Sequence, residues 1–190
     1  EKFIKEKGLI CYGGTAINNV LPPEAQFYDR AFEIPDYDFF SSSPLEDCKE
    51  LADIYFASGF IDVEAKAGIH YGTFKVFVNY TPMADITYMH PDLFKRIQSE
   101  AITIDRINYC PVNYLRMNMY LELSRPSGDV SRWDKVFRRL MLLNEYYPIK
   151  ISAICELDRT DDGATIVDNV TSQKLKYVQQ IIQEEMADLG

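Results

Sequence analysis

The sequence predicts an α+β fold in which a mixed sheet with flanking helices is followed by a helical segment. Short apolar or alternating runs, which are typical of strands, are spread over residues 1–110. Helix-start signals lie between these runs, and helical spacing dominates residues 111–150. The chain has 190 residues, of which 47% are hydrophobic, so it is long enough to bury one sizeable core.

The first predicted elements are two strands with a short helix between them. The apolar run 9–12 predicts a short buried strand, and two glycines then predict a tight turn. Residues 16–21 predict a short helix, because two prolines follow and stop it. The aromatic stretch 36–40 predicts the second strand.

The middle of the chain predicts a longer helix and three more strands. Ser43-Pro44-Leu45-Glu46 has the pattern of a capping box with proline at the first helical position, and the helix is expected to end near Ser58, before Gly59. Residues 60–65 predict a strand. The runs 73–80 and 83–89 predict a hairpin with Thr81-Pro82 as its turn.

The remaining elements are mainly helical. Residues 91–98 predict a short helix and 101–109 one further strand. A helix is expected from Pro111 to about Leu123. Ser131-Arg132-Trp133-Asp134 is a second capping-box pattern, which predicts a helix to Tyr147. Residues 149–166 are ambiguous, and 171–189 predict a final helix with an apolar face.

Two acids, Asp36 and Asp38, lie one residue apart in the second predicted strand. Successive side chains of a strand point to opposite faces, so these two carboxylates are expected to share one face. Neighbouring carboxylates repel each other, and a divalent cation between them removes that cost. Mg²⁺ prefers such oxygen ligands. A solvated pair on the polar face of an ordinary strand is the alternative.

Gly13-Gly14-Thr15, between a predicted strand and a predicted helix, has the pattern of a phosphate cradle. Glycine lets the backbone approach an anion, and a helix N-terminus offers free N–H groups. Thr15 is expected to donate to a phosphate or to cap the helix. Asn18, one turn later, is expected to support the loop or reach the substrate, with local bonding as an equal alternative. A plain turn without a ligand is the alternative for the whole loop.

A third acid, Asp85, lies inside an apolar stretch of the predicted strand 83–89. A carboxylate there is costly unless it is paired or liganded, so we expect Asp85 to join Asp36 and Asp38. A structural ion pair with Lys75 is the alternative. Together with the glycine loop, the acids predict a metal-dependent nucleotidyltransferase.

Five stretches of the chain together resemble the catalytic subunit of poly(A) polymerases of nucleocytoplasmic large DNA viruses, the giant-virus type. The resemblance covers roughly Ile10 to Pro148, and the last stretch is its most specific part. The stretches are 12–18, 35–41, 72–78, 84–87 and 119–133. The resemblance implies a polymerase-beta-like nucleotidyltransferase fold and a polynucleotide adenylyltransferase that extends RNA 3′ ends with ATP. It also implies a place in the virion or in the virus factory of the host cytoplasm.

The expected mechanism uses two Mg²⁺ (or Mn²⁺) ions. Asp36 and Asp38 would hold both ions, and Asp85 would add a ligand to the ion that binds the acceptor hydroxyl. The phosphates would be clamped by Gly13, Gly14 and Thr15.

Cations from the helical part would hold the triphosphate, and the candidates are Lys135 together with Arg138 or Arg139. For any single one of them, a solvated helix face or a salt bridge is the alternative. Two other functions stay open: an inactive paralogue that binds a partner, and a nucleotidyltransferase that acts on another acceptor. The complete set of three acids favours activity.

The net charge of −9 argues against a broad grip on nucleic acid. We therefore expect RNA to be held mainly outside these residues, by a further domain or a second copy of the chain. Because the sequence starts at Glu1 without methionine, we expect it to be a processed or excised segment. The expected organisation is a catalytic core at 1–110, a helical segment completing the domain at 111–150, and an acidic linker with a terminal helix at 151–190. No apolar run is long enough to span a membrane, and the four scattered cysteines predict reduced buried thiols rather than zinc ligands.

Overall fold

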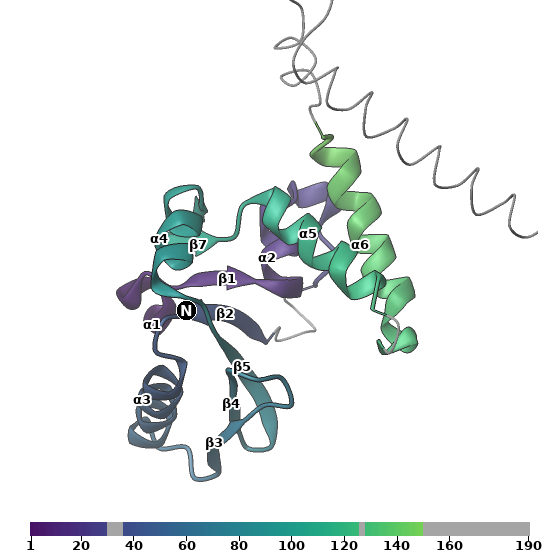
Figure 1. Ribbon diagram of the computed structural model, residues 1–190. Coiled ribbons are helices and arrows are strands. Elements are labelled where there is room, and N and C mark those ends of the chain that lie inside the picture. Colours follow the sequence, from purple (N-terminus) through teal and green to yellow (C-terminus); the bar gives the residue numbers. More distant parts are fainter. Residues whose placement is uncertain (30–35, 126–127, 150–190) are drawn as a thin grey trace, which may run out of the picture. The chain divides into compact units, whose positions relative to one another are not determined.

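The computed structural model describes residues 1–29, 36–125 and 128–149 (Figure 1). Glu1–Tyr147 form one compact unit. Its centre is a seven-stranded mixed sheet in the order β3-β4-β5-β2-β1-β7-β6. The strands are β1 (Ile10–Tyr12), β2 (Tyr37–Ser41), β3 (Val63–Ala67), β4 (Thr73–Val78), β5 (Thr81–Tyr88), β6 (Ile102–Ile104) and β7 (Ile107–Tyr109). The α+β class and the mixed sheet with flanking helices predicted from the sequence are confirmed.

The centre of the sheet combines parallel and antiparallel pairs. Strand β2 runs antiparallel to β1 and parallel to β5, while β1 runs parallel to β7. The two outer hairpins, β4–β5 and β6–β7, are antiparallel. This order places β2 beside β5, although some forty residues separate them in the sequence.

Helices cover the sheet and extend beyond one of its ends. They are α1 (Lys2–Lys7), α2 (Gly13–Val20), α3 (Pro44–Ala57), α4 (Pro91–Ser99), α5 (Val112–Leu123) and α6 (Trp133–Tyr146), with short 3₁₀ turns η1 (Pro23–Ala25) and η2 (Val130–Arg132). Helix α3 packs on β3, β4 and β5, and α5 packs on both α2 and α6 (Figure 1). Among the described residues, no helix is long and apolar enough to cross a bilayer.

One face of the sheet is apolar and lies against α1 and α3. Phe39 and Ile86, which are register partners, are 1% and 0% exposed. The ring of Phe3 in α1 packs on Phe39 at 6.4 Å between centroids. From α3, the buried Cys48 contacts the backbone of β4. Burial of this apolar surface is the main source of stability for the sheet.

The long helices begin close to their predicted positions, but their first turns are bonded differently. Ser43 is the N-cap of α3 and Pro44 its first residue, yet the Ser43 side chain makes no capping bond. Instead, its backbone N–H donates to Ser41 Oγ at 2.8 Å, and Ser41 lies 2.5 Å from Asp47 Oδ2. The predicted capping box is therefore wrong, because strand β2 brings a second serine to the helix start.

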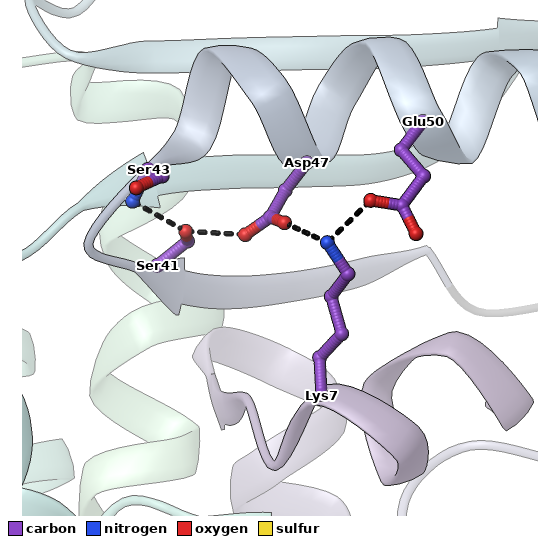
Figure 2. A network of polar contacts seen from close by, with 5 residues as sticks. All are labelled: Lys7, Ser41, Ser43, Asp47 and Glu50. Carbon is purple, nitrogen blue, oxygen red and sulfur yellow. Dashed lines mark hydrogen bonds and ion pairs between the residues drawn. The ribbon is translucent and has the colours of Figure 1, made fainter.

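Figure 2 shows how this contact continues to the N-terminal helix. Lys7 Nζ lies 2.5 Å from Asp47 Oδ1 and 2.5 Å from Glu50 Oε2. The Asp47 side chain is buried, and each of its two oxygens has a partner: the Ser41 hydroxyl and the Lys7 ammonium. One carboxylate thus joins α1, β2 and α3.

The second predicted capping box is also replaced. Helix α6 begins at Trp133, and no side chain caps it. Asp129, two residues before Ser131, accepts from the Ser131 N–H at 3.0 Å and from its hydroxyl at 2.6 Å. This places the cap on the 3₁₀ turn η2, which precedes the helix. The glycines at 13 and 14 likewise form the first turn of α2 rather than a separate turn before it.

Both hairpins turn where the sequence signal is weak. The β4–β5 turn is Asn79-Tyr80, with φ of 50° and 65°, so Thr81 and Pro82 lie in β5 instead of forming the turn. The predicted strand 101–109 is a hairpin, which turns at Asp105-Arg106 with φ of 50° and 66°. Consecutive positive φ values match the twist of two-residue hairpins, but glycine usually marks them. Strand β3 begins three residues later than predicted.

A buried arginine fixes α5 against α6. Arg116 is 5% exposed, and its Nε donates to Asn144 Oδ1 at 2.7 Å. Its other nitrogens donate to the side chain of Asn113 and the carbonyl of Tyr147. Tyr147 in turn donates through its hydroxyl to Val20 O at 2.6 Å, which joins the end of α6 to the end of α2. Arg116 is therefore part of the core.

Cys11, Cys48 and Cys110 are buried free thiols, as predicted. Cys155, the ambiguous stretch 149–166 and the predicted final helix 171–189 lie in or extend into residues outside the described ranges.

Candidate functional site

A row of polar side chains crosses the sheet on the face opposite the apolar one. Residues paired in register share a face, so the pairings Tyr12–Asp38, Asp38–Asp85, Asp85–Lys75 and Lys75–Lys66 align five side chains over five strands. Asp38 and Asp85 are direct neighbours in the middle of this row. The predicted convergence of two of the three acids thus follows from the parallel register of β2 and β5.

Asp38 lies where its negative charge is costly. Burial raises the pKa of its carboxyl to about 7, and the nearby charges of Asp36 and Asp85 add to that rise. The carboxylate also packs directly on Gly13, where a Cβ would collide with it. Gly13 has φ of 71°, a conformation that favours glycine. This glycine therefore makes room for the acid.

Asp85 is held by a lysine on one side only. Lys75 Nζ forms an ion pair with Asp85 Oδ2, so the structural alternative considered from the sequence is part of the structure. The second oxygen, Oδ1, is buried and has no hydrogen-bond partner. An orphaned buried carboxylate oxygen is costly and favours an additional ligand. The lysine pair and a ligand on Oδ1 are therefore compatible.

Asp36 lies just before β2 and is exposed. Thr15, which is 2% exposed, donates its hydroxyl to the Asp36 carbonyl at 2.7 Å. Its hydroxyl is thus used to fix the backbone at the first acid. In this arrangement Thr15 connects the glycine-started helix to the acids.

Asn18 holds the segment that follows α2. Its Oδ1 accepts from the backbone N–H groups of Phe27 and Tyr28 at 2.8 and 2.9 Å. The side chain is 2% exposed, and its amide donates to Asn19. Of the two roles considered from the sequence, support of a loop is the one this geometry displays.

The basic candidates on α6 point to different surroundings. Arg138 pairs with Asp134 one turn earlier at 2.9 Å and is 76% exposed, and Lys135 is exposed. Arg139 instead lies at the start of α2, where a Cβ built on Gly14 would be 2.8 Å from its Nη1 and 2.6 Å from Tyr28 Oη. The empty side-chain position of Gly14 is therefore filled by Arg139 and Tyr28.

The acids have the donor chemistry that Mg²⁺ or Mn²⁺ requires, although they are not gathered into a finished metal site. Within the described residues, no three Asp, Glu, His or Cys side chains are grouped closely enough to hold an ion as they stand. Asp85 Oδ1 is nevertheless an unpartnered buried oxygen, and the charges of Lys75 and Arg132 offset only part of the cost of ionising Asp38. Oxygen ligands of this kind fit a hard divalent cation.

Sequence patterns named Arg139 as one of three basic candidates but could not single it out, and they did not locate Tyr28 or the role of Tyr12. Tyr12 stacks on Phe40 at 4.0 Å, and its hydroxyl lies 2.8 Å from Thr87 Oγ1 beside the acids. Its signal, an aromatic residue directly before the glycines, was visible, but its partner is 75 residues away. Arg139 and Tyr28 are 111 residues apart, and no local pattern connects them.

Comparisons with known proteins agree with this geometry. The family model described as "Poly(A) polymerase catalytic subunit" matches residues 1–129. A protein of African swine fever virus (strain Badajoz 1971 Vero-adapted), named "Putative poly(A) polymerase catalytic subunit", is 35% identical over 156 residues, which is 79% of this chain and 32% of the relative. A protein of Acanthamoeba polyphaga mimivirus with the same name is 32% identical over 152 residues, 78% of this chain and 26% of the relative. The chain thus spans about a third or less of the length of these relatives.

Solved structures share the fold. The Megavirus polyadenylate synthase has a TM-score of 0.72 at 34% identity, over 78% of this chain and 30% of that one. The protein JHP933 of Helicobacter pylori has a TM-score of 0.52 at 14% identity, over 76% of this chain and 62% of that one, and shows the fold alone. The resemblance inferred from the five sequence stretches is confirmed: this chain belongs to the family of poly(A) polymerase catalytic subunits.

Proposed function

We propose that the chain is the nucleotidyltransferase part of a poly(A) polymerase and transfers AMP from ATP to the 3′ hydroxyl of RNA. The observation that carries the proposal is the register pair Asp38–Asp85, which sits beside the glycine-started helix α2 in a chain of the catalytic-subunit family. A nucleotidyltransferase needs acids and a phosphate-facing backbone next to each other, and here Gly13 and Asp38 are in contact.

In the proposed reaction, the 3′ oxygen of RNA bonds to the α-phosphorus of ATP as the bond to the β-phosphate oxygen breaks. The hydroxyl proton is lost and pyrophosphate leaves. Asp36, Asp38 and Asp85 would hold the divalent ions, which supply charge for the leaving pyrophosphate and lower the pKa of the attacking hydroxyl. The protein's own part is to hold Asp38 beside Asp85 and against Gly13 at the start of α2.

Lys75 has a defined part in this proposal. Its ammonium neutralises one oxygen of Asp85, which leaves Oδ1 for a further ligand. The pair therefore fixes the Asp85 side chain in place while one of its oxygens stays available.

RNA is proposed to be held mainly outside the described residues. Three arginines of the helical part already have internal partners: Arg116 is buried in the α5–α6 contact, Arg132 pairs with Glu122, and Arg138 pairs with Asp134. Together with the net charge of −9, this leaves few free cations for phosphates. A further domain or a second copy would supply the remaining grip, in the virion or the virus factory.

The test is primer extension by this chain and by a longer protein that contains it, with each of the four nucleoside triphosphates and Mg²⁺. We expect both to extend an RNA primer with ATP, the chain alone slowly and distributively. Asp38→Asn should abolish extension in both while the melting temperature stays equal or rises. Asp92→Asn, an exposed acid in the first turn of α4, is the matched control and should keep the wild-type rate. Wild-type extension by Asp38→Asn would contradict the proposal.

A further inference from the structure

The position of Arg139 is the feature that the proposed function does not yet explain. Helix α6 carries it to the first turn of α2, and its Nη1 lies 2.8 Å from where a Gly14 Cβ would be. Any side chain at position 14 would displace it. Gly14 is thus the residue that allows this cation to reach the start of α2.

Two aromatic rings hold the guanidinium in place. Its central carbon lies 4.6 Å from the ring centroid of Phe27 and 5.4 Å from that of Tyr28. Its Nη2 donates to Tyr28 Oη at 2.8 Å. The rings are fixed in turn, because Asn18 accepts from the backbone N–H groups of both residues. The arginine is therefore preorganised rather than free to swing into solvent.

This cation has no counter-ion in the described part of the chain. Arg138 and Arg132 form ion pairs with acids, and Lys75 pairs with Asp85, whereas none of the described ion pairs includes Arg139. The half-buried guanidinium of Arg139 loses part of its hydration, and cation–π contacts with the two rings replace some of the lost stabilisation. A guanidinium has five N–H donors in a planar fork, so donors remain for an anion after the bond to Tyr28.

We propose that Arg139, positioned by Tyr28 and Asn18, is the cation that binds the β- and γ-phosphates of the nucleoside triphosphate at the start of α2. This proposal rests on the proposed function and selects one cation from the three candidates on α6. Arg139 lies against Gly14 in the first turn of α2, and the N–H groups of that turn form the positive end of the helix. Arg138 and Lys135 serve the solvent face of α6.

The experiment measures binding by the 190-residue chain with Mg²⁺, using a non-hydrolysable ATP analogue, inorganic pyrophosphate and AMP as probes. Arg139→Ala should weaken the binding of the ATP analogue and of pyrophosphate about 10- to 100-fold, as expected for lost hydrogen bonds to a charged group. AMP affinity should change less than threefold, because AMP lacks the contacted phosphates. Arg138→Ala is the matched comparison on the same helix, and it should leave all three affinities within twofold.

Two further variants separate binding from folding. Tyr28→Phe removes one hydroxyl and keeps the ring. It should weaken the binding of pyrophosphate about tenfold or less and leave the melting temperature nearly unchanged. Arg139→Lys keeps the charge but not the fork, and should recover part of the pyrophosphate affinity lost in Arg139→Ala. A purely structural role would move AMP and pyrophosphate affinity together.

The outcomes also separate this inference from the proposed function. If the wild-type chain binds the ATP analogue and extends RNA while Arg139→Ala binds pyrophosphate normally, only the inference fails. It also fails if Arg138→Ala, not Arg139→Ala, loses pyrophosphate affinity. If the wild-type chain binds neither the ATP analogue nor pyrophosphate, the proposed function and the inference fail together.

Discussion

Burial and two neighbouring acids oppose the charge of Asp38. Each of these causes raises the pKa of its carboxyl, which reaches about 7. At the same row position of the next strand, Asp85 has gained a lysine instead. Two acids in direct register thus have different surroundings: Asp85 has a direct ion pair with Lys75, whereas Lys75 and Arg132 offset only part of the cost of ionising Asp38.

The sign of the Asp38 effect on stability follows from its raised pKa. A folded-state pKa of about 7 against an ordinary value of 3.8 means that the carboxyl stabilises the fold at low pH. That contribution, at most about 4 kcal/mol, is lost as the pH rises from about 4 through 7. Thermal melts without metal should therefore show falling stability over this range, and Asp38→Asn should flatten the profile. Added Mg²⁺ should restore stability above pH 7. An identical profile in the mutant would contradict the assignment.

The Lys75–Asp85 pair gives a second prediction at this scale. Lys75→Ala removes the only cation paired with Asp85 among the described residues and should destabilise the metal-free chain by about 1–3 kcal/mol in urea unfolding. Because Mg²⁺ would neutralise the same acid, the loss should shrink when Mg²⁺ is added. Lys2→Ala is the control: Lys2 pairs with Glu6 on an exposed surface, and its loss should change stability by about 0.5 kcal/mol or less. If Mg²⁺ leaves the loss of stability in Lys75→Ala unchanged, Asp85 does not bind the ion.

At the scale of elements, local patterns predicted most helices and strands, while turns and caps depended on distant partners. Alternation placed β2, β4 and β5 nearly correctly, since each buries one apolar face. The turn at Asn79-Tyr80 was missed because Thr81-Pro82 is the stronger local signal. The cap of α3 was missed because Ser41, in another element, provides the acceptor. The acids could be predicted from strand alternation, whereas Arg139 could be named only as one of three candidates, because its partners Phe27 and Tyr28 lie in another part of the sequence.

In the network of Figure 2, Asp47 joins α1, β2 and α3, so its loss should destabilise the contacts among all three elements. Asp47→Ala removes the acceptor of the Ser41 hydroxyl and one of the two acceptors of Lys7, and it leaves the buried hydroxyl proton of Ser41 without a partner. Urea unfolding should show a loss of about 2–3 kcal/mol. Glu50→Ala removes the exposed partner of the same lysine and should cost about 0.5 kcal/mol or less. Equal losses in the two variants would show that Asp47 is not the centre of the network.

For the whole molecule, the charge balance limits what these residues do with RNA. A net charge of −9 and arginines that are already paired leave few contacts for phosphates. We expect the affinity of the 190-residue chain for RNA to fall only weakly with salt, because few counter-ions are released. A filter-binding titration at several salt concentrations measures this slope, with the longer protein as the comparison. Nanomolar binding with a steep slope by the chain alone would show that it holds RNA by itself.

The hydrogen bond from Thr15 to the Asp36 carbonyl closes a stretch of chain at its two ends. Because that bond fixes the acid relative to α2, added residues between the two ends need not move the acid. Loop closure becomes only about 0.6 kcal/mol more costly when a loop doubles in length. The first part of this stretch is not free to change, because Phe27 and Tyr28 hold the guanidinium of Arg139. Insertions between Tyr28 and Asp36 are therefore expected to be tolerated better than insertions before Phe27.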